Sequence, residues 1–310
     1  MPVFDLVIIG GGPAGITAAV YAARKKLDFL LITADIGGQA PWSGDIANYT
    51  GYNFVTGPEL VSKFEEHLKQ FPVNIKEGEF ARSIDKKGDI FEIWTSRGAY
   101  EAKSVIIATG KRSRELNVPG EKEFKNKGLA YCATCDGPLF AGKDTAVIGG
   151  GNSALDAALQ LVRYCTKVYI INNTERLGGD TVMKEQAEKA GNLEVLNSSK
   201  VLEVLGGKVV SGLKIEKVKD GNTEIVELKV QGVFVEIGLL PNSEFAALAG
   251  KNSAGEIVVN ADCATGIPGI FAAGDVTNVA EKQIIIAAGE GAKAALAAFK
   301  YLLVSGKLSQ

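Results

Sequence analysis

The sequence contains little histidine and little cysteine. Its 310 residues include one histidine and four cysteines. A structural zinc ion needs four ligands, usually from paired cysteine or histidine motifs, so we expect no metal site. Four cysteines are also too few to hold a chain of this length together through disulfides. We assign no role to His67, Cys165 or Cys263, which leaves Cys132 and Cys135 to be explained.

The chain also lacks an excess of either charge and any long apolar run. Charged residues make up 23% of it, and the formal net charge is −2. This balance gives no electrostatic reason to expect nucleic acid or an anionic lipid surface as a partner. Residues 1–5 do not form a basic segment followed by an apolar stretch, and no uncharged apolar run reaches membrane-spanning length. We therefore expect a cytoplasmic protein with no membrane or nucleic-acid partner.

Glycine, in contrast, is abundant, and it clusters after apolar runs. The chain has 37 glycines, and the apolar run 6–9 leads directly into the first cluster. A helix pattern follows, which is typical of a strand, a tight turn and a helix that bind a dinucleotide. In this motif Gly10 permits the turn, Gly12 lets the backbone approach a pyrophosphate, and Gly15 lets helix and strand pack closely. A second strand, 29–33, ends near Asp35, where a ribose-binding acid is expected.

The same pattern occurs a second time near the middle of the chain. The apolar run 145–148 precedes Gly149–Ala154, with Ala154 in place of the third glycine. The second strand of this copy, 168–171, ends at Asn172. An acid at that point binds the 2′-hydroxyl of NADH, and basic residues bind the 2′-phosphate of NADPH. Asn172 is neither, although an amide could still form a hydrogen bond with a ribose hydroxyl.

Between the two glycine motifs lies a pair of cysteines, Cys132 and Cys135, followed by Asp136. Two thiols separated by two residues can close a small disulfide ring, and a lowered pKa of one thiol makes a reactive thiolate. Asp136 could pass a proton to or from that thiolate. Half of a zinc site or a chance spacing are the alternatives, and we favour redox chemistry.

The order of the elements predicts an α/β fold with two Rossmann-like domains. Each is doubly wound and three-layered, and the second is inserted into the first. A last strand ends in Gly274-Asp275 and is followed by a helix pattern over 289–303, so the tail is expected to fold back onto the first domain. We expect a first dinucleotide-binding domain from residues 1–113 and 244–310, and an inserted NAD(P)-binding-like domain from residues 114–243.

These motifs resemble those of the low-molecular-weight thioredoxin reductase family over nearly the whole chain. The matching motifs are 10–15, 37–39, 108–110, 132–137, 149–154, and 274–275 with Gln283. Residues 135–140 and 282–291 are even more similar to the flavoprotein subunit of alkyl hydroperoxide reductase. That protein carries an additional amino-terminal thiol domain, for which we expect no counterpart in this chain.

The resemblance implies FAD on the outer domain and electron transfer through the cysteine pair. It implies that Cys135 faces the flavin, that Cys132 attacks the disulfide of a partner, and that Asp136 is the acid–base residue. It also implies a homodimer in which the inserted domain rotates. The implied cofactor contacts are Gly10, Gly12, Pro13, Ala14, Gly15, Asp35, Gly38, Gln39, Asn48, Ala108, Thr109, Gly110, Gly274, Asp275, Gln283 and Ile284. The second nucleotide motif comprises Gly149, Gly151, Asn152, Ala154 and Asn172.

One departure from the family concerns the electron donor. Members that use NADPH carry a His-Arg-Arg run and a further arginine where this chain has Asn172, Asn173, Thr174 and Gly178. Without guanidinium groups a 2′-phosphate has no bidentate partner, so we expect poor use of NADPH. NADH and reduced ferredoxin, which relatives use, remain as donors.

The favoured function is therefore a flavin-dependent disulfide reductase that acts on a thioredoxin-like protein through Cys132 and Cys135. A dithiol oxidase, in which oxygen regenerates the flavin, is one alternative. A non-catalytic redox sensor, whose inserted domain shifts on oxidation, is another.

Overall fold

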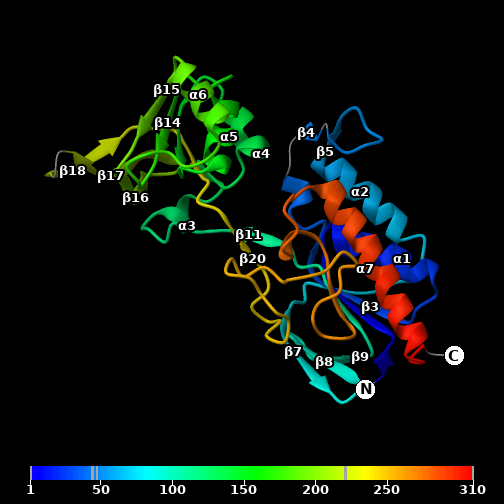
Figure 1. Ribbon diagram of the computed structural model, residues 1–310. Coiled ribbons are helices and arrows are strands. Elements are labelled where there is room, and N and C mark those ends of the chain that lie inside the picture. Colours follow the sequence, from blue (N-terminus) through cyan, green and yellow to red (C-terminus); the bar gives the residue numbers. More distant parts are fainter. Residues whose placement is uncertain (1, 43–44, 47, 220–221, 309–310) are drawn as a thin grey trace. The chain divides into compact units, whose positions relative to one another are not determined.

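The chain leaves one unit, builds a second, and then returns to the first. The computed structural model describes residues 2–42, 45–46, 48–219 and 222–308 (Figure 1). Residues 1–112 and 240–310 form the first unit, and residues 113–239 form the second. The connecting segments, β11 (Lys111–Ser113) and β20 (Leu239–Pro241), pair with each other in a two-stranded sheet.

The first unit is built on a parallel sheet. Alternate residues of its strand β2 point to opposite faces, and both faces are buried because apolar layers cover them. Leu6 and Ile8 belong to one apolar cluster, whereas Val7 and Ile9 belong to another. The strands, in spatial order, are β21 (Ile270–Ala272), β10 (Val105–Ile107), β2 (Leu6–Gly11), β3 (Phe29–Ile36) and β6 (Asn74–Glu77).

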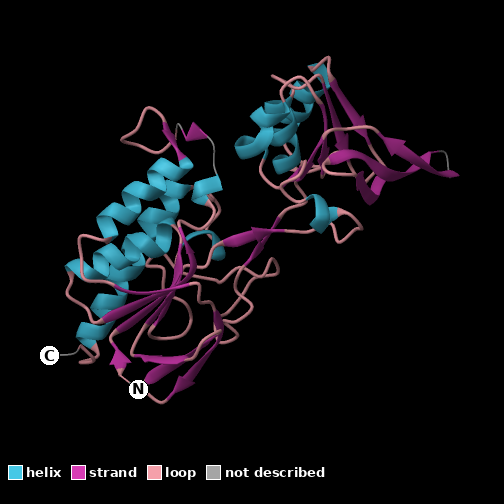
Figure 2. Ribbon diagram, turned by 180° about the vertical axis from the view of Figure 1, so that it is seen from behind, coloured by secondary structure: helices cyan, strands magenta, loops and turns pink. Residues whose placement is uncertain are grey.

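Helices cover one face of this sheet, and a second sheet covers the other. Helices α1 (Pro13–Arg24) and α7 (Ile284–Val304) lie side by side on the first face (Figures 1 and 2). A Cβ placed on Gly291 would lie 2.0 Å from the Ala14 carbonyl oxygen, so this close approach of the two helices requires glycine. The opposite cover consists of β1 (Val3–Phe4), β9 (Ala99–Ala102), β8 (Ile90–Thr95) and β7 (Ala81–Lys87).

The beginning of α7 differs from the sequence prediction. The helix begins at Ile284 rather than at Gly289, because packing overrides the low helix propensity of its three initial isoleucines. Ile284 packs against the small apolar cluster that includes Ile46 and Leu60. The remaining elements of this unit are η1 (Ala40–Trp42), β4 (Asp45–Ile46), β5 (Val55–Thr56), α2 (Gly57–Leu68) and η3 (Gly274–Val276).

The second unit repeats this plan at smaller size. Its parallel sheet has the order β12 (Leu129–Ala130), β19 (Gly232–Val235), β13 (Asp144–Ile148), β14 (Lys167–Ile171) and β15 (Leu193–Leu196). Helices α5 (Asn152–Leu161) and α6 (Thr181–Lys189) pack on one face. The other face is covered by the antiparallel strands β16 (Ser199–Gly206), β17 (Val210–Lys219) and β18 (Asn222–Leu228). Three short elements complete the unit: α3 (Glu121–Phe124), α4 (Ala133–Asp136) and η2 (Gly137–Phe140).

The predicted fold class is confirmed. Each unit has a parallel sheet between a helical layer and a second, mainly antiparallel, sheet, and the second unit is inserted into the first. Among the residues that the structure describes, none of the helices combines the length and the apolar character that a membrane span requires.

Candidate active site

The first glycine motif has the geometry that a bound pyrophosphate requires. Gly10 has a φ of +110°, and a Cβ there would lie 2.3 Å from the Ala108 carbonyl oxygen. A Cβ on Gly15 would lie 1.8 Å from the Gly10 carbonyl oxygen, so these two glycines permit close packing of strand and helix. Gly12, the residue before α1, has no atom within 4 Å of its Cβ position. The free N–H groups of the helix start, where an anion is stabilised, follow it directly.

The structure brings together candidate residues from distant parts of the chain, and two of them lie against this motif. The Asn48 side chain donates a hydrogen bond to Gln283 Oε1 at 3.0 Å, across 235 positions of sequence. Gly274, with a φ of +76°, lies against Ala14 at the start of α1. Gly38 approaches the Cα of Gly12, since a Cβ on Gly38 would lie 3.2 Å from it.

Other predicted contacts lie where the chain leaves the first unit. The Gln39 side chain donates to the Lys111 carbonyl oxygen. Thr109 Oγ1 donates to the Asn242 carbonyl oxygen at 2.6 Å, and the Asn242 side chain donates back to the Thr109 carbonyl oxygen at 2.8 Å. Asp35, at the end of β3, is exposed, so its carboxylate is available to a ligand.

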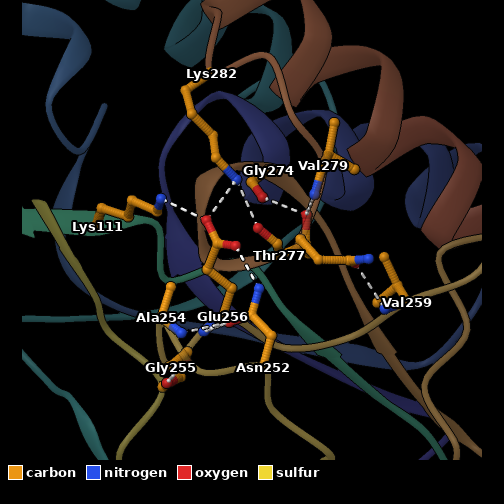
Figure 3. Close-up of polar contacts among 12 residues, drawn as sticks. Lys111, Asn252, Ala254, Gly255, Glu256, Val259, Gly274, Thr277, Val279 and Lys282 are labelled. Carbon is orange, nitrogen blue, oxygen red and sulfur yellow. Dashed lines mark hydrogen bonds and ion pairs between the residues drawn. The ribbon is translucent and has the colours of Figure 1, made fainter. Parts of the chain in front are cut away.

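A cluster of two lysines and one glutamate, which the sequence did not predict, lies beside Gly274 (Figure 3). Glu256 Oε1 is 2.7 Å from Lys111 Nζ and 3.2 Å from Lys282 Nζ. Lys282 also donates to the Thr277 carbonyl oxygen at 2.6 Å, and Asn252 donates to Glu256 Oε2 at 2.7 Å. Because Lys282 directly precedes Gln283, the cluster fixes the segment that enters α7.

The lysines of this cluster set the charge around the candidate flavin residues. Burial alone would raise the pKa of Glu256, but hydrogen bonds from Lys111, Asn252 and Lys282 outweigh it and lower the pKa to about 2. Burial raises the pKa of Asp275, and the charges of Lys282 and Lys111 oppose that shift. Two ammonium groups therefore stand close to two carboxyl groups at this edge of the first unit.

The cysteine pair lies in the second unit, directly after a strand of its parallel sheet. Cys132 follows β12 and precedes α4, and it is disulfide-bonded. Cys165 and Cys263 are free and buried. Cys135 belongs to α4, but its side chain lies outside the described part of the structure. Asp136 donates its backbone N–H to the Cys132 carbonyl oxygen at 3.1 Å, and burial raises the pKa of its carboxyl group.

Hydrogen bonds from α5 hold one of the two residues between the cysteines. Thr134 Oγ1 donates to Gln160 Oε1 at 2.9 Å, and Gln160 Nε2 donates to Asp156 Oδ2 at 2.7 Å. Burial raises the pKa of Glu236, which directly follows β19, to about 7, and the backbone N–H of Ala133 opposes that shift. Sequence spacing gave no signal for these groups, because they come from separate elements.

The second glycine motif shares the backbone geometry of the first. Gly149 has a φ of +141°, and a Cβ there would lie 2.2 Å from the Glu236 carbonyl oxygen. Gly151, like Gly12, has no atom within 4 Å of its Cβ position and directly precedes a helix, α5. Asn152 Oδ1 accepts the Asp180 N–H at 2.7 Å. Ala154 is fully buried and packs toward Gly149, so an alanine fits the third position of this motif.

Asn172, the predicted ribose-binding position of this second motif, bonds within the protein. Its side chain is 2% exposed, and Nδ2 donates to the Thr174 carbonyl oxygen at 3.0 Å and to Asn197 Oδ1 at 2.8 Å. Its Oδ1 accepts the Thr174 hydroxyl at 2.9 Å, and it occupies the space where Gly150 would carry a Cβ. Both donors of the amide are therefore used, and a ribose hydroxyl would have to displace one of these bonds.

An open depression of about 700 Å³ lies beside the turn that follows Asn172. Its walls carry two carboxylates, Glu175 and Glu216, and one ammonium group, Lys200. This surface offers a 2′-phosphate more repulsion than attraction. The other residues of its wall are Asn173, Thr174, Ser198, Ser199 and Val218. Within the described ranges, no group of three or more histidine, cysteine or acidic side chains is arranged to hold a metal ion.

The fold and the site together define a class of protein, and comparison with known proteins gives the family. A family model described as pyridine nucleotide-disulphide oxidoreductase matches residues 4–291. The chain belongs to this family. Membership implies FAD and a pyridine nucleotide as cofactors, in agreement with the FAD predicted from the sequence.

Particular relatives agree with the resemblance stated from the motifs. The chain is 44% identical over 303 residues to a protein named NADH dehydrogenase from Ferdinandcohnia aciditolerans. It is 45% identical over 307 residues to a protein from Pseudomonas putida that is named as a subunit of alkyl hydroperoxide reductase. In both cases 97% of this chain is covered but only 58% of the relative, so the chain spans somewhat more than half the length of these proteins.

Solved structures match the chain over nearly its whole length. The thioredoxin reductase of Lactococcus lactis superposes with a TM-score of 0.80 at 38% identity, covering 97% of this chain and 99% of that one. A ferredoxin-flavin thioredoxin reductase from Clostridium acetobutylicum gives a TM-score of 0.56 at 32% identity, covering 99% of both chains. The predicted likeness to low-molecular-weight thioredoxin reductases is confirmed.

Proposed function

We propose that this protein is a flavin-dependent disulfide reductase that passes electrons from FAD, through a dithiol of Cys132 and Cys135, to the disulfide of a thioredoxin-like protein. The observation that carries the proposal is the disulfide at Cys132, placed at the start of α4 and next to the partly buried carboxyl group of Asp136. We propose Cys135, three residues further along the chain, as the second sulfur of the redox pair. A small disulfide ring of this kind is a reversible acceptor of two electrons.

The first unit supplies the residues that would hold FAD. Gly12 and the start of α1 would bind the pyrophosphate, and Asp35 would bind a ribose hydroxyl. Asp275, with Asn48 and Gln283, would contact the remainder of the cofactor. When bound, the flavin supplies two-electron transfer between the donor and the disulfide. We propose that the other cofactor contacts predicted from the sequence also line this FAD site.

The second unit supplies the sulfur chemistry. Two electrons break the S–S bond, one sulfur leaves as a thiolate, and the other takes up a proton. Asp136 is the proposed source and acceptor of that proton, because burial favours its protonated form and it directly follows Cys135. The Cys132 thiolate then attacks the disulfide of the thioredoxin-like partner, which leaves that partner with two thiols and restores the ring.

For the electron donor we propose NADH, with reduced ferredoxin as the alternative, and not NADPH. The depression beside Asn172 carries more carboxylates than ammonium groups, and the second motif lacks guanidinium groups at the positions that would meet a 2′-phosphate. A relative at 44% identity is named NADH dehydrogenase, and a structural neighbour is named a ferredoxin-flavin thioredoxin reductase. We further propose that the protein is a cytoplasmic homodimer.

The test is an anaerobic stopped-flow experiment in which NADH, NADPH and reduced ferredoxin are each mixed with the flavoprotein while the flavin absorbance is followed. We expect rapid bleaching with NADH or ferredoxin and slow bleaching with NADPH. Rapid bleaching by NADPH would contradict the donor assignment. Rapid bleaching without reduction of thioredoxin, but with hydrogen peroxide release from small dithiols, would replace the reductase by a dithiol oxidase, and slow bleaching with every donor would favour a redox sensor.

A pair of cysteine variants separates the proposed roles. Cys135→Ser should abolish the long-wavelength band that arises from charge transfer between a thiolate and the flavin. Cys132→Ser should keep that band while losing turnover. An undiminished band in the Cys135→Ser protein would overturn the assignment.

A further inference from the structure

A buried glutamate of α7 is hydrogen-bonded to the residue that precedes Asp275. Glu290 is 7% exposed, and its Oε2 accepts the backbone N–H of Gly274 at 2.8 Å. The two residues are 16 positions apart, and the bond between them is buried. Because a buried N–H that loses its acceptor has no water to replace it, this carboxyl group stabilises the turn that contains Gly274.

The backbone groups of Gly274 are all used in this turn. Gly274 has a φ of +76° and lies between β21 and η3. Its carbonyl oxygen accepts the N–H of Thr277 at 3.0 Å and the hydroxyl of Thr277 at 2.8 Å. Its N–H donates to Glu290, which is the only contact of the three that comes from α7. The position of Asp275, the next residue, therefore depends on an acceptor outside the turn.

The same part of α7 also contacts the start of α1. A Cβ on Gly291, the residue after Glu290, would lie 2.0 Å from the Ala14 carbonyl oxygen. A Cβ on Gly274 would lie 3.1 Å from the Ala14 Cβ and 3.4 Å from the Ala287 Cβ. The bond from Glu290 thus fixes the Gly274 turn at the place where α1 and α7 meet, and both the turn and the start of α1 carry proposed cofactor contacts.

We infer that Glu290 is a positioning residue for the FAD site: its carboxyl oxygen, as the acceptor of the Gly274 N–H, holds Asp275 where it contacts the cofactor. The inference rests on the proposed function, because that proposal places FAD on the first unit with Asp275 among its contacts. The site needs from Glu290 an oxygen at the right distance and not a charge. In agreement, burial raises the pKa of Glu290, and the Gly274 N–H is foremost among the effects that oppose this shift.

Two substitutions separate the acceptor oxygen from the charge. Glu290→Gln keeps an oxygen at the same distance and removes the charge, whereas Glu290→Asp keeps the charge and withdraws the oxygens by one methylene. We expect Glu290→Asp to raise the dissociation constant of FAD about tenfold, and Glu290→Gln to change it by less than about twofold. The constant is measured by serial dilution of the purified flavoprotein, in which released FAD is detected by its fluorescence.

Leu302→Ala is the matched control for a general loss of stability. Leu302 is fully buried near the end of the same helix and belongs to the apolar cluster beneath it. Its truncation should lower the melting temperature without altering the Gly274 turn. The dissociation constant of FAD in this variant should stay within about twofold of that of the unaltered protein.

The outcomes separate the inference from the proposed function. An unchanged dissociation constant in Glu290→Asp, or an equal increase in Glu290→Gln, would overturn the inference even if the protein reduces thioredoxin. An equal increase in Leu302→Ala would also overturn it, since the effect would then follow from general stability. Weaker binding confined to Glu290→Asp would support it even if no thioredoxin-like protein is reduced. An unaltered protein that binds no FAD would overturn both.

Discussion

The two glycine motifs of this chain have the same backbone and different surroundings. In both, the first glycine has a positive φ and packs against a carbonyl oxygen, and the glycine before the helix is open on its Cβ side. The strand that follows ends differently in each copy. Asp35 is exposed and available, whereas Asn172 is buried and bonded to Thr174 and Asn197. The comparison teaches that the glycine motif specifies a strand, turn and helix, and that the residue after the next strand decides which ligand it can take.

The neighbourhoods of the two copies reinforce this difference. Around the first, Gly38 and Gly274 approach from distant parts of the chain, and Asn48 is hydrogen-bonded to Gln283. Around the second, Asn152 accepts the Asp180 N–H, and Gln160 on the same helix holds the cysteine segment through Thr134. We propose the first copy as the FAD site, and the second as a nucleotide motif that also supports the disulfide segment.

The largest effect is expected from placing one negative charge in each copy. Gly12→Asp and Gly151→Asp are a matched pair, because both sites have room for a Cβ and neither has a positive φ. Gly12→Asp should weaken FAD binding about a hundredfold or more, since it sets a carboxylate against the pyrophosphate. Gly151→Asp should leave FAD bound. The flavin-to-protein absorbance ratio of the purified proteins measures FAD binding. Equal loss of flavin in both variants would contradict the assignment of FAD to the first motif.

Replacing Asn172 with aspartate should reduce stability, whereas replacing Asp35 with asparagine should not. Asn172→Asp loses two donors and leaves buried acceptors facing a carboxylate, so we expect a loss of about 2–3 kcal/mol in the free energy of unfolding. Asp35→Asn, at an exposed position, should change it by less than about 0.5 kcal/mol. Urea denaturation at pH 7 measures both. An Asn172→Asp protein as stable as the unaltered one would show that the two hydrogen bonds donated by Asn172 contribute little to stability.

The lysine–glutamate cluster should make the stability of the first unit depend on pH. The pKa of Glu256 falls from 4.5 to about 2 in the folded protein, so its stabilisation is present above about pH 4.5 and is lost as the pH falls toward 2. Glu256→Gln should therefore cost about 1–3 kcal/mol at pH 7 and progressively less below pH 4.5. The exposed Glu66→Gln, which removes a surface ion pair, is the control and should have a small effect. A cost for Glu256→Gln that does not depend on pH would contradict the assigned charge.

The smallest effect concerns the donor. Asn173 is exposed beside the depression, so Asn173→Arg adds a guanidinium group there without disturbing a buried bond. We expect kcat/KM for NADPH to rise about tenfold, with little change for NADH. No gain for NADPH would mean that the 2′-position of a bound nucleotide lies elsewhere.

Much of the fold was predictable because local signals agreed with it. The apolar run before Gly10, the glycine spacing and the helix pattern all favour the same unit, and the repeat at Gly149 predicts the second. The predicted start of α7, Gly289, was wrong, because the helix begins at Ile284. Ile284 and its neighbours favour a strand by propensity and become helical through packing. Such a tertiary preference has no local sequence signal.

The site was predictable only in part, for a related reason. Motif residues such as Asp35 and Asp136 stand at fixed spacings from glycines or cysteines, so sequence can point to them. Glu256 acts through its contact with Lys111, which is far away in the chain, and the residues next to Glu256 in the sequence give no sign of that role. Asn172 illustrates a third case, in which the position was identified but its internal hydrogen bonds became visible only in the fold.

The most direct test of the central claim is an anaerobic reductive titration of the purified flavoprotein that counts electrons per chain. The account predicts four electrons before the protein is fully reduced, two for the flavin and two for the disulfide at Cys132, and only two for Cys132→Ser. Uptake of two electrons by the unaltered protein, with the disulfide left intact, would contradict it.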